Sequence, residues 1–335
     1  MEAKKVKLFL AMGVLLFSFS YDKLLGWRLP THFPKPIYNF SSNVYSEAKV
    51  TLGRALFYDP ILSLDNSISC ASCHSSYNAF AHTDHALSHG IFDSVGTRNA
   101  PALFNLAWQK LFMWDGAVNH IDVQALAPLT HASEMGETLQ NVLQKLGRTK
   151  LYPNLFYRAF GDSLINTERM LKSLSQFQLS LISAQSKYDR VKLNLDTFTS
   201  QEKRGYQLYT KYCQHCHTEP LFSTYQFKQN FLPLDSSLLD YGRGSITHNK
   251  QDTFTFKIPS LRNLSYTYPY MHDGRFLNIS QVLTHYQNVE MLDRLSSTKP
   301  DLIAFLLTLN DSSFVFNPQF KYPREIFMWR EGFNK

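Results

Sequence analysis

Cysteine, strings of like charge and long apolar runs are all scarce in this sequence. Only four of the 335 residues are cysteine, and none directly follows the N-terminal apolar segment, which argues against a lipoprotein. No basic stripe with interleaved aromatic residues is present, so nucleic acid is not an expected partner. Alternation of polar and apolar residues is nowhere sustained, so little β-structure is expected.

The composition indicates a folded globular protein. Hydrophobic residues make up 44% of the chain and charged residues 18%, a balance that excludes intrinsic disorder. The formal net charge of +7 is scattered without a run. At 335 residues the chain is long enough for two domains of ordinary size.

The N-terminus has the pattern of an export signal. Lys4, Lys5 and Lys7 precede an apolar stretch over residues 8–19, which is too short for a comfortable membrane span. There is no clear Ala-x-Ala cleavage site, so an uncleaved N-terminal anchor stands beside a signal peptide as an alternative. We expect residues 1–22 to direct the protein to the periplasm.

All four cysteines fall in two copies of one motif, "CASCH" at residues 70–74 and "CQHCH" at residues 213–217. C-x-x-C-H is the attachment signature of c-type haem: two thiols form thioethers with the vinyl groups, and the adjacent histidine binds the iron. A zinc ribbon would place its two C-x-x-C knuckles ~15–20 residues apart, much closer than residues 70–74 and 213–217 are, so a zinc ribbon is excluded. Disulfides or thioredoxin-like sites would leave the repeated histidine unexplained. The sequence therefore predicts two covalently bound haem c groups, one on Cys70, Cys73 and His74 and the other on Cys213, Cys216 and His217.

Apolar residues recur with helical spacing around both motifs. The longest helical candidate covers residues 166–188, and Thr199 with Glu202 has the spacing of a capping box. We predict a mainly α protein with two cytochrome c-like helical domains in tandem, each with one covalently bound c-type haem. The N-terminal domain is expected over residues 40–190 and the C-terminal domain over residues 195–322.

The two halves also repeat each other. "PALFNLAWQKLFMWDG" (residues 101–116) aligns without a gap on "PSLRNLSYTYPYMHDG" (residues 259–274). In this register Tyr286 falls on Pro128, which has no donor atom on its ring. If these segments cover the open haem faces, the second iron meets a phenol oxygen and the first stays open. A six-coordinate haem suits electron transfer and a five-coordinate haem can bind a small molecule.

Polar residues flank Pro128 in the first half. "QALAPLTHASEM" contains Gln124 and Glu134. A carboxylate beside an open haem can take a proton from one oxygen of hydrogen peroxide and deliver it to the other, so that water leaves. Glu134 is the candidate for this general base.

These features resemble the bacterial di-haem cytochrome c peroxidase family, including its MauG-like branch, over residues 44–310. The matching elements are "CASCH", "RNAPALFN", "MWDG", "QALAPLTHASEM", "CQHCH", "PSLRN" and "YMHDGRF". The resemblance implies that Glu134 handles peroxide, that Gln124 lies in the same pocket, and that Trp114 relays electrons between the haems.

The same resemblance implies a calcium ion between the haems. Its protein ligands would be the side chain of Asn99 and the backbone carbonyls of Thr267 and Pro269. Waters would complete the oxygen shell that calcium prefers.

The sequence departs from the peroxidases that need reductive activation at the second haem. Those enzymes place Met at the distal position, whereas this chain has Tyr286, as MauG does. A thioether raises the potential of haem iron, and an anionic phenolate favours the oxidised states instead. We therefore expect the second haem to be a poorer electron acceptor and a better store of oxidising equivalents.

A second departure concerns the first haem, where activation-dependent members have a distal histidine. "AHTDHALSHG" offers His82, His85 and His89, of which His89 has the nearest but a loose spacing. We expect the first haem to be open already and each of these histidines to be a loop residue.

The sequence thus predicts an exported di-haem cytochrome c peroxidase, which reduces hydrogen peroxide to water. A small periplasmic donor, a cytochrome c or a cupredoxin, would supply electrons through the second haem, and a homodimer is compatible with this reading. One alternative is MauG-like oxidation of a protein substrate through high-valent di-haem iron. Another is a non-catalytic di-haem electron carrier.

Overall fold

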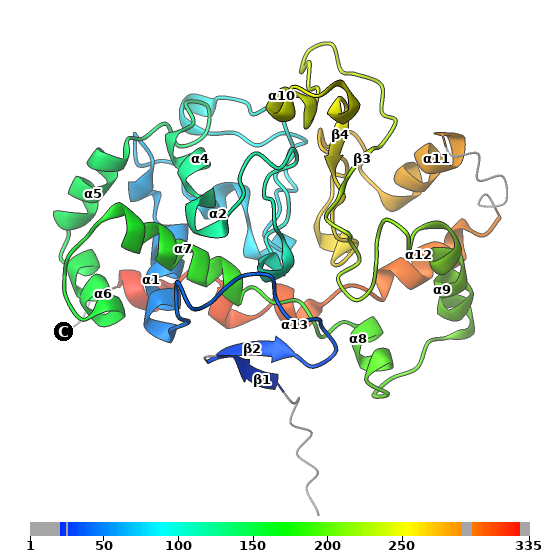
Figure 1. The fold of residues 1–335 in the computed structure, drawn as a ribbon, viewed down its shortest axis with the longest axis horizontal. Coiled ribbons are helices and arrows are strands. Elements are labelled where there is room, and N and C mark those ends of the chain that lie inside the picture. Colours follow the sequence, from blue (N-terminus) through cyan, green and yellow to red (C-terminus); the bar gives the residue numbers. More distant parts are fainter. Residues whose placement is uncertain (1–20, 25, 290–296, 329–335) are drawn as a thin grey trace, which may run out of the picture.

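The computed structural model describes residues 21–24, 26–289 and 297–328, and it is mainly helical (Figure 1). The predicted signal peptide or anchor, residues 1–22, lies almost wholly outside the described residues. No helix among the described residues has the length and apolar character needed to cross a bilayer. The helical prediction is confirmed at the level of the fold class.

Short helices alternate with long irregular connections along the chain. Two antiparallel strand pairs accompany them, β1 with β2 and β3 with β4. The elements are β1 (Tyr21–Leu24), β2 (Trp27–Pro30), α1 (Glu47–Tyr58), α2 (Cys70–Cys73), α3 (Ile121–Gln124), α4 (Leu126–Thr130), α5 (Leu139–Gly147), α6 (Leu151–Phe160), α7 (Thr167–Ser180), α8 (Lys187–Lys192), α9 (Ser200–Tyr212), β3 (Phe227–Gln229), α10 (Gly244–Thr247), β4 (Thr255–Lys257), α11 (Ile279–Val289), α12 (Lys299–Leu307), α13 (Ser312–Val315) and α14 (Arg324–Phe327).

Each half has a hydrophobic core built on one close helix pair. In the first core α1 packs on α7, where a Cβ on Gly53 would come within 1.9 Å of the Ser173 carbonyl oxygen. In the second core α9 packs on α12, where a Cβ on Gly205 would come within 1.9 Å of the Asp301 carbonyl oxygen. Glycine in both places allows the helix backbones to touch. The two halves therefore share the same kind of close helix contact.

The C-terminal segment leaves the second half and returns to the first, as the red part of the ribbon shows (Figure 1). Phe314 of α13 belongs to the first core. The hydroxyl of Tyr58 in α1 donates to the carbonyl of Phe320 over 2.6 Å. The chain after α12 therefore completes the first core, although the sequence placed residues up to 322 in the C-terminal domain.

The prediction of one continuous helix over residues 166–188 is wrong in its second half, where the helix is interrupted. α7 ends at Ser180 and α8 begins at Lys187. Between them the Leu181 carbonyl accepts from the backbone N–H of Asn105 over 2.9 Å, and the Asn105 side chain bonds both backbone groups of Ser183. These tertiary hydrogen bonds replace the helical ones.

The structure confirms the register of the internal repeat. Met113 and Met271 occupy matching positions, with φ of 68° and 78°, a region that residues with a side chain seldom adopt. The backbone N–H of Asn99 donates to the His272 carbonyl over 2.7 Å, and the N–H of Lys257 donates to the Trp114 carbonyl over 2.7 Å. The two copies thus meet by reciprocal hydrogen bonds. We call the paired segments 99–116 and 257–274 the seam.

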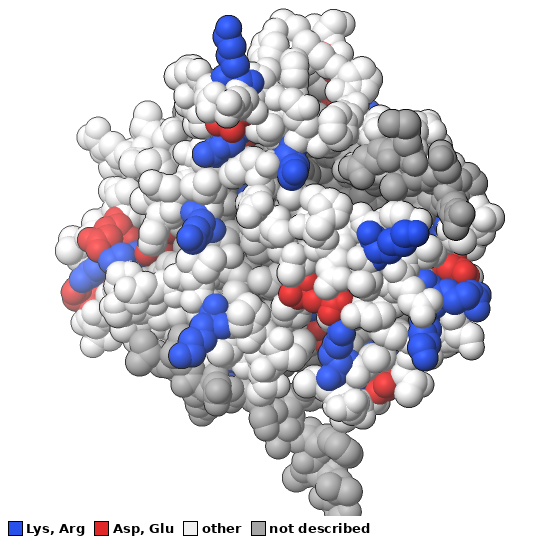
Figure 2. All heavy atoms as spheres, turned by 45° about the vertical axis from the view of Figure 1, so that its right-hand side comes forward, with Lys and Arg blue, Asp and Glu red and all other residues white. Residues whose placement is uncertain are grey.

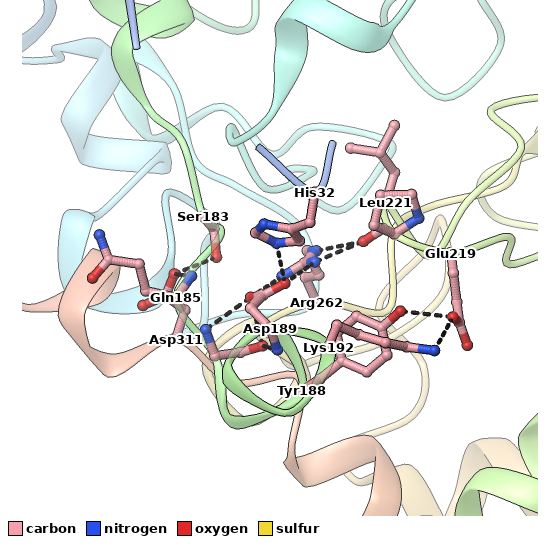
Figure 3. Close-up of polar contacts among 12 residues, drawn as sticks. His32, Ser183, Gln185, Tyr188, Asp189, Lys192, Glu219, Leu221, Arg262 and Asp311 are labelled. Carbon is pink, nitrogen blue, oxygen red and sulfur yellow. Dashed lines mark hydrogen bonds and ion pairs between the residues drawn. The ribbon is translucent and has the colours of Figure 1, made fainter. Parts of the chain in front are cut away.

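A buried ion pair ties the N-terminal segment, the connection between the halves and the second half together (Figure 3). Arg262, fully buried, donates to both carboxylate oxygens of Asp189 over 2.8 and 2.7 Å, and His32 bonds the same carboxylate over 2.8 Å. Burial opposes ionisation of Asp189, yet Arg262 and His32 hold the pKa of that carboxyl below its usual value. Because each charge is paired, the cluster can stay ionised away from water.

Charge is dispersed over the face shown in Figure 2. Lys and Arg side chains are separated by neutral surface and interspersed with Asp and Glu. This face therefore shows no continuous basic patch of the kind that binds nucleic acid.

Candidate active site

The first C-x-x-C-H motif forms a single helical turn followed by its histidine. Ser69 and Ser72 make a capping box at the start of α2, and His74 is the C-cap residue. His74 donates from Nδ1 to the Phe80 carbonyl over 2.8 Å. Burial lowers the pKa of His74 to about 4. The imidazole is therefore neutral, and its Nε2 lone pair is directed away from the backbone, as iron ligation requires.

The second motif repeats this arrangement at the end of α9, where Cys213 is the C-cap residue. His217 Nδ1 lies 3.2 Å from the Phe222 carbonyl oxygen and 3.1 Å from the Pro259 carbonyl oxygen. Burial lowers the pKa of His217 to about 4 as well. Both histidines thus have the neutral form and the backbone acceptor that orient a haem ligand.

Two buried polar atoms at matching positions after the motifs also fit a bound haem. Nε2 of His82 and the hydroxyl of Tyr225 are buried and have no hydrogen-bond partner. Buried polar atoms nearly always have a partner, so a missing one suggests a group that the polypeptide does not provide. Each half thus combines one C-x-x-C-H motif with one buried polar atom that could bond a polar group on a bound haem.

Glu134 lies close to the first motif because of a glycine. A Cβ on Gly90 would come within 2.6 Å of the Glu134 Cα atom, and the N–H of Ile91 donates to the Glu134 carbonyl over 2.8 Å. Burial raises the pKa of Cys70 to about 12 and raises that of Cys73, and the Glu134 carboxylate contributes to both shifts. Glu134 thus packs on Gly90, the neighbour of His89, whose carbonyl oxygen lies 3.8 Å from the Cys73 sulfur.

The ionisation of Glu134 is itself perturbed. Its side chain exposes 50% of its surface and lies 3.8 Å from Nδ1 of His131. Burial of the carboxyl among protein atoms raises its pKa, and His131 opposes this rise. The carboxylate form of such a group can accept a proton, which is the property that a general base requires.

Gln124 and Trp114 lie farther along the same half, towards the seam. Gln124 ends α3; its Nε2 is 3.9 Å from the sulfur of Met113, and its Oε1 accepts from Gln178 over 3.5 Å. The indole N–H of Trp114 donates to the Asn99 carbonyl over 2.8 Å. Within the described residues no hydrogen bond joins Gln124 to Glu134. Trp114 is thus fixed within the seam, by its indole and by the Lys257 amide that bonds its carbonyl.

Comparison with known proteins decides the family. Residues 47–197 match the family described as di-haem cytochrome c peroxidase. The chain is 32% identical to the methylamine utilization protein MauG of Methylophilus methylotrophus, over 85% of this chain and 88% of that protein. It is 30% identical to cytochrome c551 peroxidase of Nitrosomonas europaea, over 81% of each chain. The protein belongs to the di-haem cytochrome c peroxidase family.

Solved structures agree with this membership. A crystal structure of a MauG-like protein associated with microbial copper homeostasis has a TM-score of 0.80 and 28% identity, with 89% of this chain and 99% of that chain covered. The predicted resemblance is confirmed, and so is the enzyme class, an oxidoreductase that acts on peroxide.

Tyr286 of this family member lies on the inward side of α11. Ile279 and Leu283 of this helix pack towards the second core, and Tyr286 follows at the same helical spacing. The next residue back, His285, bonds the Asn230 carbonyl through Nε2 over 2.7 Å. The rings of His285 and Tyr286 nevertheless lie 5.3 Å apart, so the two neighbouring side chains contact each other.

The three histidines near the first motif form a short row. The rings of His82 and His85 are 5.8 Å apart, and those of His85 and His89 are 4.8 Å apart. His89 Nδ1 is held by Asp93 over 2.5 Å, and the His89 carbonyl lies 3.8 Å from the sulfur of Cys73. The His89 ring is thus already engaged by a carboxylate.

The predicted calcium ligands lie on the two sides of the seam. The Asn99 amide nitrogen donates to the Ala86 carbonyl over 3.0 Å, so Oδ1 is the side-chain atom that could bind a cation. Thr267 and Pro269 follow the short turn Leu264–Tyr266 on the other side. The described residues contain no cluster of three or more His, Cys, Asp or Glu side chains that could hold a metal. A cation in the seam would therefore depend on amide and carbonyl oxygens, which suit calcium.

Sequence reasoning missed two residues that shape this region. Gly90 sets the approach of Glu134, and only the tertiary contact reveals its role. Lys257 lies in the seam, and extending the repeat by two residues places it on Asn99. Extending the repeat would therefore have identified Lys257 from the sequence.

Proposed function

We propose that this protein is a periplasmic peroxidase that reduces hydrogen peroxide at a haem held by His74, Cys70 and Cys73. Cys213, Cys216 and His217 would hold a second haem covalently, and this haem would accept the electrons of a small cytochrome c or cupredoxin. The tandem cytochrome c-like domains, residues 40–190 and 195–322, each carry one haem, and the end of the second domain packs back on the core of the first. The matching neutral histidines support this assignment.

The observation that carries the proposal is the close packing of Glu134 on Gly90, the neighbour of His89, whose carbonyl oxygen lies 3.8 Å from the sulfur of Cys73. When bound, the haems supply the iron that binds peroxide and carry the electrons that its reduction needs. Glu134 takes the proton from one peroxide oxygen and returns it to the other, so that the first water leaves. Solvent supplies two further protons, and two electrons complete the reduction to a second water.

The remaining residues hold these parts in place. Gln124 borders the peroxide pocket and Trp114 lies between the halves as the electron relay. Tyr286 is the phenolate ligand of the second haem. Calcium is held by Asn99 Oδ1 and the carbonyl oxygens of Thr267 and Pro269, which fixes the seam that contains Trp114.

Steady-state turnover of peroxide with a reduced small cytochrome tests the peroxidase. Glu134→Gln should abolish turnover while both haems stay attached. Glu168→Gln is the matched control, because this exposed carboxylate forms an ion pair with Lys172 on the surface of α7. Turnover that survives in Glu134→Gln would refute the role of Glu134.

A second candidate is MauG-like oxidation of a protein substrate, favoured by the relative named MauG and by Tyr286. Its signature is peroxide-dependent modification of a partner protein, without turnover of reduced cytochrome. A resting electron paramagnetic resonance spectrum with no high-spin haem would instead support the non-catalytic electron carrier.

A further inference from the structure

The two halves of the seam carry different side chains at one equivalent position. In the register of the repeat, Lys257 falls on Asn99. Both backbone amides make the same reciprocal 2.7 Å hydrogen bond to the other copy, Asn99 to His272 and Lys257 to Trp114. The two side chains therefore leave the backbone at equivalent places in the two copies.

The acceptors of Lys257 are the counterparts of the proposed calcium ligands. The Lys257 ammonium donates to Oε1 of Gln109 over 2.8 Å and to the carbonyl oxygen of Leu111 over 3.0 Å. In the same register Gln109 falls on Thr267 and Leu111 falls on Pro269. The residues that receive the ammonium in one half are thus the repeat counterparts of the residues that we propose as calcium ligands with Asn99 in the other, although Gln109 acts through its side chain and Thr267 would act through its backbone carbonyl.

These acceptors are neutral oxygens, the kind that surround a hard cation. In the described part of the chain no carboxylate forms an ion pair with Lys257. The nearest acidic influence is Asp115, whose carboxylate is bonded by Arg98 over 2.5 Å. Burial lowers the pKa of Lys257 to about 7 and Asp115 opposes this shift, so experiments at about pH 6 keep the ammonium charged.

We infer that the Lys257 ammonium is a built-in cation, which fills in one half of the seam the position that calcium fills in the other. The seam then needs a positive charge at both equivalent positions, and only the position beside Asn99 requires an added ion. This inference rests on the calcium site proposed above. Both charges would hold the segments that flank Trp114 against each other.

The test compares Lys257→Asn with Lys257→Met in the holoprotein at pH 6. Asn restores the amide oxygen found at position 99, whereas Met removes the charge without offering a ligand. With calcium added, Lys257→Asn should bind about two equivalents against about one for the wild type, and its melting temperature should rise by roughly 3 °C more than that of Lys257→Met. Lys228→Asn, an exposed lysine on the paired strand β3, is the surface control and should match the wild type.

The reverse variant provides a second readout. Asn99→Lys should lose bound calcium but keep its melting temperature in a chelator, whereas Asn99→Ala should lose both. Equal calcium responses of Lys257→Asn and Lys257→Met would overturn the inference, as would equal melting temperatures of Asn99→Lys and Asn99→Ala. A wild-type holoprotein that binds no calcium would overturn the calcium site itself, while peroxide turnover would still report on the peroxidase separately.

Discussion

The backbone N–H of Lys257 donates a 2.7 Å hydrogen bond to the carbonyl oxygen of Trp114. This bond joins a strand of the second half to the residue proposed to carry electrons between the haems. Its counterpart from Asn99 to His272 makes the contact reciprocal. The halves are therefore held in register at the place where electron transfer between them depends on a fixed separation.

The pH dependence of peroxide turnover should follow Glu134. Burial raises the pKa of its carboxyl, and only the ionised form can accept a proton from peroxide. We expect kcat/KM for peroxide to rise with pH through a pKa above the ordinary glutamate value of ~4.3. Glu134→Gln should lower kcat/KM by ~10²–10⁴-fold and remove this limb from the profile. An unchanged acidic limb in the variant would assign it to another group.

Replacement of Tyr286 should alter the second haem alone. Tyr286→Phe removes the phenol oxygen and keeps the aromatic ring at this position of α11, so the fold and haem attachment should persist. The electron paramagnetic resonance spectrum of the resting protein should change for the haem at His217, and its reduction potential should shift upwards, because a phenolate favours oxidised iron. Tyr241→Phe, at an exposed position, is the control. Identical spectra for Tyr286→Phe and the wild type would show that the phenol does not bind iron.

Removal of Arg262 should destabilise the protein strongly. Arg262→Met leaves the Asp189 carboxylate buried without its guanidinium partner, and the expected loss in unfolding free energy is about 3–5 kcal/mol. The exposed pair of Arg204 with Asp301 is the control, and Arg204→Met should change stability by less than about 1 kcal/mol. Denaturant unfolding followed by circular dichroism measures both. Similar losses for the two variants would mean that burial does not decide the strength of the Arg262 pair.

The close helix contact of the second core should not tolerate a methyl group. A Cβ on Gly205 would come within 1.9 Å of the Asp301 carbonyl oxygen, so Gly205→Ala must separate α9 from α12. We expect a loss of at least ~1–3 kcal/mol, measured as a lower melting temperature of the holoprotein. Gly147→Ala is the matched control, because no atom lies within 4 Å of its added Cβ. If both alanine variants melt like the wild type, the helix contact is less rigid than described.

Local chemistry determined much of this protein from its sequence alone. The haem attachment motifs, the helical class and the register of the repeat depend on residue types at fixed short spacings, because covalent attachment and helical periodicity act over a few residues. The sequence could therefore align Met113 with Met271, and the structure gives both the same unusual backbone. Family resemblance then assigned a role to Glu134.

Only the tertiary structure decided what depends on contacts between distant segments. The predicted helix over residues 166–188 breaks because Asn105 offers Leu181 and Ser183 better hydrogen-bond partners than the helix does. Glu134 comes near the first motif because Gly90 lacks a side chain, and Lys257 finds Gln109 and Leu111 across the seam. These outcomes depend on which surfaces meet when the chain packs, and no pattern within a short window of sequence contains that information.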